Sequence, residues 1–345
     1  MFGNPEGGRA RNPPNCFSVG ATDFRRWWGI VGVATLILFA PFDAHATNCK
    51  PRRPLPAIVV TSMGPCKYDR DTFNFAGDPV EQAKCLLRPV AKWAKLGPKL
   101  SSLPLVLAAR VGRASGLPDR SALAALLTEL QLDRRLGEGL LHPISRARDN
   151  DPDAPAAKYF VIHDTSGPKL RSFPADIDKN RRINNLARFR CSDSFEVAHV
   201  IANRRGDLFV GHDLSVPWRS TKFERALNFG GELKGLFLHV ELIQPRGGRH
   251  SNLAPNPGFA AIQYDRLALV YTLASVRGGQ WLIPAFHAVI DSDIFNGHDD
   301  PQNFDLASFA HSLEMLLDKL SQGKAVPFES ILSPLTPSPP ITQSP

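Results

Sequence analysis

Segments with the hydrophobic patterns of strands and of helices follow one another between residues 157 and 320, and this order limits the folds open to the chain. The expected strands are 159–163, 198–203, 207–211, 236–243 and 281–290. The second and third of these flank a short polar turn, Arg204-Arg205-Gly206, which favours a hairpin. The expected helices are 259–276 and 304–320, where apolar residues recur at helical spacing. This succession predicts an α/β fold with a mixed central β-sheet flanked by helices.

The sequence before this region predicts a smaller, helical region. Residues 47–150 begin with a proline-rich, basic stretch and continue as a small helical region. One helix is expected over 79–88, where Pro89 ends it. A second helix is expected to begin after Asp119 or Ser121, since either residue can act as its N-cap.

Composition also marks the boundaries of the main domain. Residues 146–156 are charged and contain two prolines, which indicates a linker. The main domain is then expected over 155–322. Residues 323–345 are rich in proline and serine and poor in apolar residues, which predicts a disordered tail.

An apolar segment near the N-terminus indicates export. The 16 residues from Trp27 to Phe42 are almost all apolar and precede Ala44-His45-Ala46. Such a run is short for a membrane-spanning helix, which needs about 20 residues. The pattern favours a secretory signal peptide over residues 1–46, and hence a periplasmic or secreted protein. The alternative is an uncleaved N-terminal anchor, and no integral membrane domain is expected beyond it.

The chain is basic, with a formal net charge of +8 at pH 7. Residues 1–46 hold four arginines and three acidic residues, so the rest of the chain keeps +7. This balance favours an anionic partner such as nucleic acid, phospholipid or an acidic polymer of the cell envelope. No helix-turn-helix or zinc-finger motif supports nucleic acid, and an export signal argues against it. We therefore expect no nucleic-acid partner, while the oligomeric state stays open.

Four of the five cysteines lie after the expected signal peptide, namely Cys49, Cys66, Cys85 and Cys191. An even number in an exported protein permits two disulfides, with three possible pairings. The pair Cys66–Cys85 closes the shortest useful loop and would leave Cys49 with Cys191. The alternative is four unpaired thiols in a reducing compartment. The sequence has no C-x-x-C pair, which disfavours a cysteine zinc site.

Two histidines and one aspartate are candidates for metal binding. His163 ends an expected strand before a small polar turn, and His287 lies within or at the end of the expected strand 281–290. Asp300 follows 13 residues after His287. Two neutral imidazoles and one carboxylate, with an open fourth position, make a catalytic zinc site.

Glu241 is the candidate for acid–base chemistry. It lies in the expected strand 236–243, where alternation places it on one face with Phe237 and His239. A buried charge without a partner is costly, so this position is either a solvated edge of the sheet or a general base beside a metal. His199 could line the same cleft or pack in the sheet. The remaining candidates are expected to have surface or structural positions, namely His212, His250 and His311.

Five motifs in order resemble the zinc-dependent N-acetylmuramoyl-L-alanine amidases, the family of phage amidase-type lysozymes and peptidoglycan recognition proteins. They are YFVIHDTSG, AHVIANRRGDLFV, LFLHVELI, GFAAIQYDRLALVYTL and FHAVID…DDP…FDLASF. The resemblance covers residues 157–320, about half of the chain. It implies the fold of this family for the main domain, and peptidoglycan or muropeptides as the binding partner.

The resemblance also implies roles for individual residues. His163, His287 and Asp300 would bind one Zn²⁺ per chain, with Asp299 as a rival for the third position because the spacing from His287 is long. Glu241 would be the catalytic carboxylate. His298 stands where many members have a lysine that holds the oxyanion, and Asp164 stands where they often have a second histidine. The implied activity is hydrolysis of the amide bond between N-acetylmuramic acid and L-alanine, and the alternative is a non-catalytic peptidoglycan-binding protein of the same fold.

Overall fold

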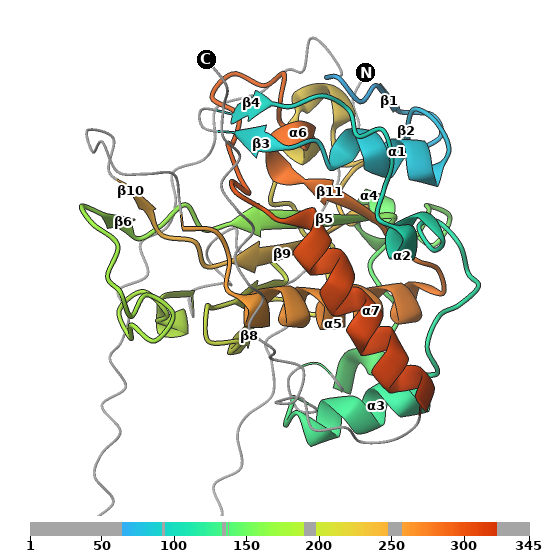
Figure 1. Cartoon of the computed structure of the whole chain (residues 1–345). Coiled ribbons are helices and arrows are strands. Elements are labelled where there is room, and N and C mark those ends of the chain that lie inside the picture. The colour runs from blue at the N-terminus through green and yellow to red at the C-terminus, as the bar shows by residue number, and fades with distance from the viewer. Residues whose placement is uncertain are drawn as a thin grey trace, which may run out of the picture. The chain divides into compact units, whose positions relative to one another are not determined.

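The computed structural model describes residues 64–91, 94–132, 136, 138–189, 198–247 and 257–322 (Figure 1). The expected signal peptide, the expected tail and His250 lie outside the described residues, as do Cys16, Cys49 and Cys191. Within the described part of the chain, no helix has both the length and the apolar character needed to span a membrane.

A five-stranded mixed sheet in the order β11-β5-β9-β7-β8 forms the centre of the fold. Its strands are β5 (Tyr159–Asp164), β7 (Val200–Ala202), β8 (Leu208–Val210), β9 (Phe237–Leu242) and β11 (Ile283–Phe286). Neighbouring strands run parallel, except β7 and β8, which form the expected antiparallel hairpin. The α/β class with a mixed central sheet is therefore confirmed.

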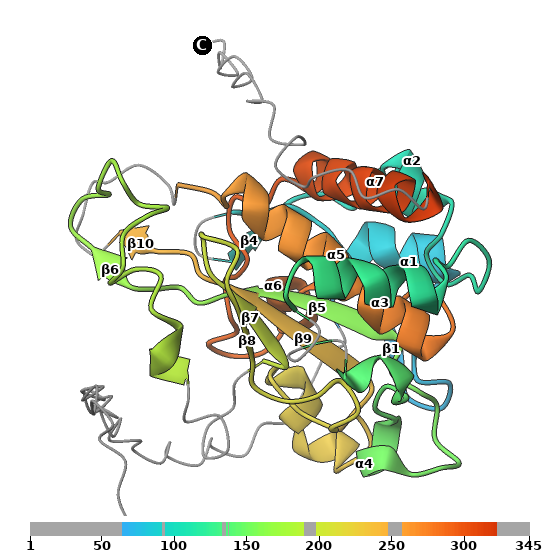
Figure 2. The same cartoon turned by 90° about the horizontal axis from the view of Figure 1, so that it is seen from below.

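Helix α5 (Ala261–Gly278) lies against one face of the sheet, and α7 (Leu306–Gln322) packs alongside α5 (Figure 2). Tyr271 of α5 makes both contacts, because its ring lies 5.2 Å from that of Phe160 in β5 and 5.8 Å from that of Phe309 in α7. The segment that contains α5 connects the parallel strands β9 and β11, which need a crossover of this kind. Gly279 ends the helix in the left-handed conformation (φ 72°) that glycine adopts without strain.

The opposite face of the sheet carries aromatic side chains and, nearer the carboxyl ends of β5 and β9, the candidate site residues His163 and Glu241. Tyr159 of β5 stacks on Phe237 of β9, with ring centroids 5.1 Å apart. Phe223 approaches Phe237 edge-on from the connection between β8 and β9. Because side chains alternate along a strand, His163 and Glu241 belong to this same face. The shorter elements that follow β5 are β6 (Lys169–Leu170), η4 (Leu186–Phe189), η6 (Phe223–Arg225), η7 (Leu227–Phe229), β10 (Arg246–Gly247) and α6 (His287–Ile290).

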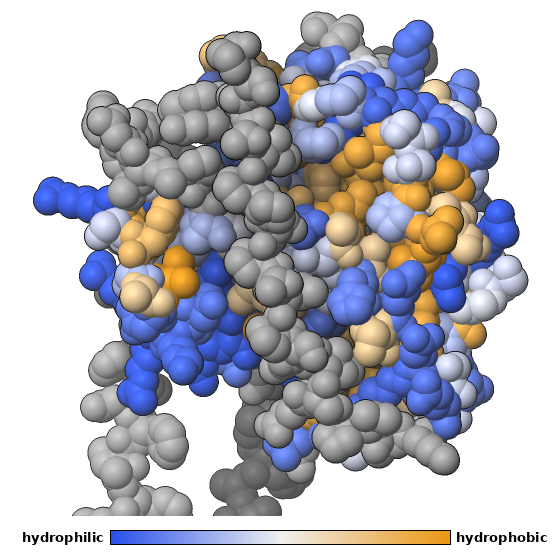
Figure 3. Space-filling view, in the orientation of Figure 1, coloured by the Kyte–Doolittle hydropathy of each residue, from blue (hydrophilic) through white to orange (hydrophobic). Residues whose placement is uncertain are grey.

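The segment before β5 packs on the same hydrophobic core as the sheet. Its elements are β1 (Tyr68–Asp69), β2 (Asn74–Phe75), α1 (Pro79–Leu86), β3 (Val90–Ala91), β4 (Lys95–Leu96), α2 (Leu105–Ala108), α3 (Arg120–Glu129), η3 (Glu138–Leu141) and α4 (Ala147–Asn150). Helix α1 begins after Asp78, whose side chain accepts the Glu81 amide, and α3 begins after Asp119. Both helices expected in this segment therefore form, and α1 ends at Leu86 rather than Arg88. Apolar side chains gather on the surface around α1 and α2 (Figure 3), where Leu105 is exposed.

Covalent and polar links tie this segment to the sheet. The Cys66–Cys85 disulfide, one of the expected pairs, joins its beginning to α1. The Tyr159 hydroxyl of β5 donates to Gln82 Oε1 of α1 and accepts the backbone N–H of Phe75, each at 2.9 Å. The charged segment 146–156 includes α4, and two of its three alanines, Ala147 and Ala154, are buried.

The expectation of one strand over 281–290 is wrong. Strand β11 ends at Phe286, and His287 is the first residue of the short helix α6. The amide of Asp291 accordingly donates to the carbonyl of His287, and the amide of Ala288 donates to the carbonyl of Asp300. All residues of this segment from Trp281 to Ile290 are buried, so their unbroken apolar pattern carries no period that separates a strand from a helix.

Candidate metal centre

The candidate residues meet at one edge of the sheet. His163 lies near the carboxyl end of β5, and the register pairs it with Glu241 of β9. Phe286, the last residue of β11, pairs with Ile162 of β5, so His287 follows at the level of His163. The carboxyl ends of parallel strands lie at the same edge, which is where α/β sheets bind ligands. Strand register alone therefore brings three distant positions of the sequence together.

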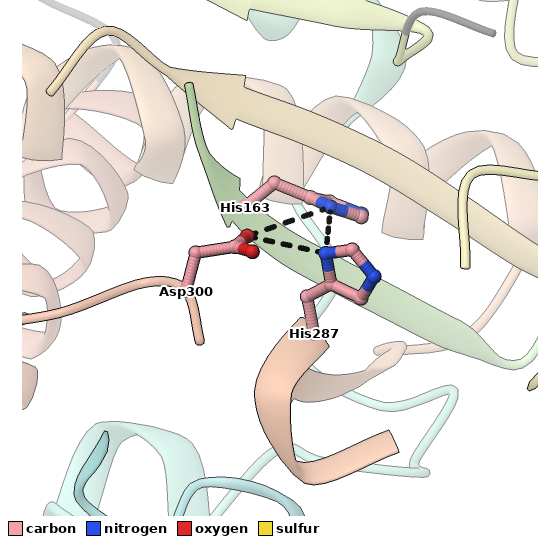
Figure 4. A group of neighbouring side chains, drawn as sticks. All are labelled: His163, His287 and Asp300. Atoms are coloured by element: carbon pink, nitrogen blue, oxygen red, sulfur yellow. Dashed lines mark hydrogen bonds and ion pairs between the residues drawn. The ribbon is translucent and has the colours of Figure 1, made fainter. Parts of the chain in front are cut away.

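His163, His287 and Asp300 point toward one another (Figure 4). Nδ1 of His163 lies 2.8 Å from Nδ1 of His287 and 3.8 Å from Oδ2 of Asp300, and Nδ1 of His287 lies 3.2 Å from Oδ2 of Asp300. Around a tetrahedral Zn²⁺ with bonds of about 2.0–2.1 Å, neighbouring ligand atoms are about 3.3 Å apart. The three distances lie around this value, so the donor types and their spacing fit a zinc ion.

The carboxylates at this group favour a cation, and burial opposes it. All three side chains are almost fully buried. Burial lowers the pKa of His287, but the carboxylates of Asp300 and Asp291 outweigh it and raise the pKa to about 10. Burial and the neighbouring His287 lower the pKa of His163 well below its ordinary value. Two imidazole nitrogens this close need one proton between them, donated by one ring to the other, and a bound metal ion would take the place of that proton.

Asp300, and not Asp299, belongs to this group. Asp300 is 2% exposed, and its Oδ2 accepts the backbone N–H of Asp164 at 3.1 Å. The Asp299 carboxylate instead forms an ion pair with Arg246 and accepts from the Gln302 side chain at 2.8 Å. The structure therefore distinguishes the two aspartates that the sequence left as rivals.

Asp164 supports the group without entering it. Its carboxylate accepts from Arg246 Nη2 at 3.0 Å and from the backbone amides of Ser166 and Gln302 at 2.7 and 3.0 Å. Burial and the nearby Asp300 raise the pKa of Asp164 to about 6, against the opposing effect of Arg246. Asp164 thus connects the end of β5 to the segment around Asp300, because its carboxylate accepts the Gln302 amide and its own amide donates to Asp300.

Asp291 is a residue of the site that sequence reasoning missed. Its Oδ2 lies 3.0 Å from Nε2 of His287, and its oxygens accept the backbone amides of Lys222 and Phe223 at 3.2 and 3.0 Å. Burial raises the pKa of Asp291, but the adjacent His287 outweighs this and holds it well below its ordinary value. A carboxylate in this position orients a ligand histidine and makes the nitrogen that binds the metal more basic. The i, i+4 spacing from His287 could have indicated Asp291 only if α6 had been expected.

His298 lies beside the site, at its partly exposed side. Its Nδ1 is 3.0 Å from Oδ2 of Asp291, and its ring centroid is 4.1 Å from that of His287. The His298 side chain is 46% exposed, unlike the buried ligand candidates. His287, Asp291 and His298 form a second group of possible ligands, but Asp291 already accepts two backbone amides there. We therefore interpret Asp291 as the anchor of both histidines.

Glu241 lies on the central strand β9, so the alternative of a solvated edge strand is wrong. It faces the same side of the sheet as His163, its partner in the register. Burial raises its pKa to about 7, with Asp300 and Asp164 adding to the shift and His287 opposing it. A carboxyl group with this pKa can accept and release a proton near neutral pH.

The other histidines separate into two groups. His199 is fully buried, and its two ring nitrogens bond to the His239 amide at 3.0 Å and the Val216 carbonyl at 3.1 Å. It therefore packs in the sheet, the second of its two expected placements. His239, missed as a site residue, contacts His163 with its Nδ1 at 3.0 Å from His163 Nε2. His212 stacks on Trp218, and His311 is exposed on α7.

Comparisons with known proteins add no relative: no family model, no curated protein and no solved structure matches the chain.

Proposed function

We propose that this protein is an exported zinc-dependent amidase that hydrolyses the bond between N-acetylmuramic acid and L-alanine in peptidoglycan. The observation that carries the proposal is the triangle of His163 Nδ1, His287 Nδ1 and Asp300 Oδ2, with Glu241 next to it in the register. The ordered motifs that resemble the amidase family supply the substrate class. Zn²⁺ is the proposed cofactor, one per chain.

The residues of the chain divide the work of the reaction between them. When bound, Zn²⁺ would polarise the amide carbonyl and a water molecule. Glu241 accepts a proton from the attacking water and transfers it to the leaving amine of L-alanine. His298, at the partly exposed side, donates a hydrogen bond to the carbonyl oxygen as negative charge develops on it. Asp291 holds His298 in place for this role.

Charge and disulfide chemistry support a role in the cell envelope. The chain outside residues 1–46 carries a net charge of +7, which favours binding to an anionic wall polymer. The Cys66–Cys85 disulfide is typical of an oxidising compartment outside the cytoplasm. We therefore propose a periplasmic or secreted location. The alternative is that residues 1–46 are not cleaved and anchor the protein to the membrane.

The test is digestion of purified peptidoglycan, followed by mass spectrometry of the released products. We expect free stem peptides that begin with L-alanine and glycan strands left intact. Glu241→Gln is the matched control, because it should keep zinc and lose cleavage. Zinc binding and wall binding without cleavage would instead favour the non-catalytic recognition protein.

A further inference from the structure

The second ring nitrogen of His163 points away from the candidate metal position and into the core. His163 Nε2 lies 3.0 Å from His239 Nδ1, and His239 Nε2 lies 3.2 Å from Oε2 of Glu224. His239 and Glu224 are both fully buried. We propose that His239 and Glu224 are positioning residues that hold His163 with Nδ1 directed at the metal. This inference rests on the zinc function proposed for the site.

The surroundings of Glu224 fix the direction of these hydrogen bonds. Its Oε2 accepts from the Thr221 hydroxyl at 2.8 Å, the Thr221 amide at 3.0 Å and the Ser220 amide at 3.1 Å. An oxygen that already accepts three hydrogen bonds also meets His239 as an acceptor, so His239 Nε2 is the donor of their contact. His239 Nδ1 is then an acceptor and receives the N–H of His163 Nε2. The lone pair of His163 Nδ1 is left facing the candidate metal position.

His239 is itself held rigidly. Its backbone N–H donates to His199 Nδ1 at 3.0 Å, and His199 Nε2 donates to the Val216 carbonyl at 3.1 Å. The rings of His199 and His239 stack, with centroids 5.6 Å apart and planes 12° apart. Rotation of the His239 ring would break its contacts with His163 and Glu224 and its stacking on His199.

An imidazole and a carboxylate buried in a core are costly to desolvate, and apolar side chains would avoid this cost. A functional role explains why the chain keeps these polar groups in the core, because both proposed ligand histidines have a buried carboxylate on the side of the outer ring nitrogen. A buried carboxylate contacts the outer nitrogen of His287 directly, and another reaches that of His163 through His239. Such outer partners fix the tautomer and orientation of a ligand, and their loss typically lowers metal affinity 10–100-fold.

The experiment measures zinc affinity and histidine tautomers in the full-length protein. His239→Leu removes the acceptor, His239→Asn restores an acceptor oxygen near the position of Nδ1, and Glu224→Gln removes the charge. His311→Leu, at an exposed position on α7, is the matched control. Zinc affinity is measured by competition with a chelator, and folding by circular dichroism and thermal unfolding. Nitrogen-15 NMR of the histidine rings reports which nitrogen carries each proton.

We expect Nε2-protonated rings at both His163 and His239 in the parent protein. Zinc affinity should fall about 10–100-fold in His239→Leu and in Glu224→Gln, and recover substantially in His239→Asn. A folded His239→Leu variant that binds zinc as tightly as the parent would overturn the proposal. So would an Nδ1-protonated His163 in the parent, a result that needs no variant to fold. A parent that binds no zinc refutes the metal centre itself, and the positioning role with it.

Discussion

Replacement of the Glu241 carboxyl should remove both the activity and its dependence on pH. A pKa of about 7 means that roughly one carboxyl in a hundred is ionised at pH 5. Because a general base must be deprotonated to accept a proton, kcat/KM should fall roughly tenfold per pH unit below the inflection. Bound Zn²⁺ favours the ionised carboxylate, so the inflection should lie between the ordinary value of 4.5 and about 7.

The assay is the initial rate of stem-peptide release between pH 5 and 8, with zinc content measured at each pH. Glu241→Gln should lower the rate about 10²–10⁴-fold and leave it nearly constant over this range. Glu314→Gln, an exposed position on α7, should behave as the parent does. A zinc-loaded Glu241→Gln variant that keeps the parent rate, or the parent inflection, would refute the role of this residue.

Three further outcomes follow from the structure. Asp291→Ala should weaken zinc binding about 10–100-fold, because the ligand histidine loses its outer carboxylate; a chelator titration measures this, and unchanged affinity would contradict the orienting role. Reduction or replacement of the Cys66–Cys85 pair, which are 19 positions apart, should lower the free energy of unfolding by about 3 kcal/mol; denaturant titration should detect the loss, and an unchanged midpoint would count against it. Tyr159→Phe should cost about 1–3 kcal/mol in the same titration, because the Phe75 amide loses a buried acceptor.

The sequence predicted the sheet well where the strands are apolar runs bounded by turns. The expected strands at 159–163 and 236–243 form as β5 and β9, and the hairpin forms around Arg204-Arg205-Gly206. These signals are local, since a strand and its turn are encoded by consecutive residues. The register pairs His163 with Glu241, which the strand predictions alone did not specify.

The parts that were missed depend on contacts between distant segments. His287 follows a continuous apolar run, which has no period that separates a buried strand from a buried helix. Helix α6 and the spacing from His287 to Asp291 were therefore not predicted. Glu224 reaches the site only because the connection between β8 and β9 folds back over the sheet, next to His239. Neither hydrophobic period nor turn chemistry encodes such a contact.

Asp299 and Asp300 illustrate the same limit at the scale of one residue. They are adjacent in the sequence, and spacing from His287 does not separate them. The choice depends on Arg246, which pairs with Asp299, and on the Asp164 amide, which holds Asp300. Both partners come from other segments of the chain, so only the fold separates the two aspartates.

The zinc content of the purified protein shows whether His163, His287 and Asp300 bind a metal ion, and it is measured for the parent, Asp300→Ala and Asp299→Ala after the same dialysis. We expect about one zinc per chain in the parent and in Asp299→Ala, and little or none in Asp300→Ala. A parent without zinc would refute the metal centre, and an Asp300→Ala variant that keeps the full content while Asp299→Ala loses it would refute the assignment of Asp300.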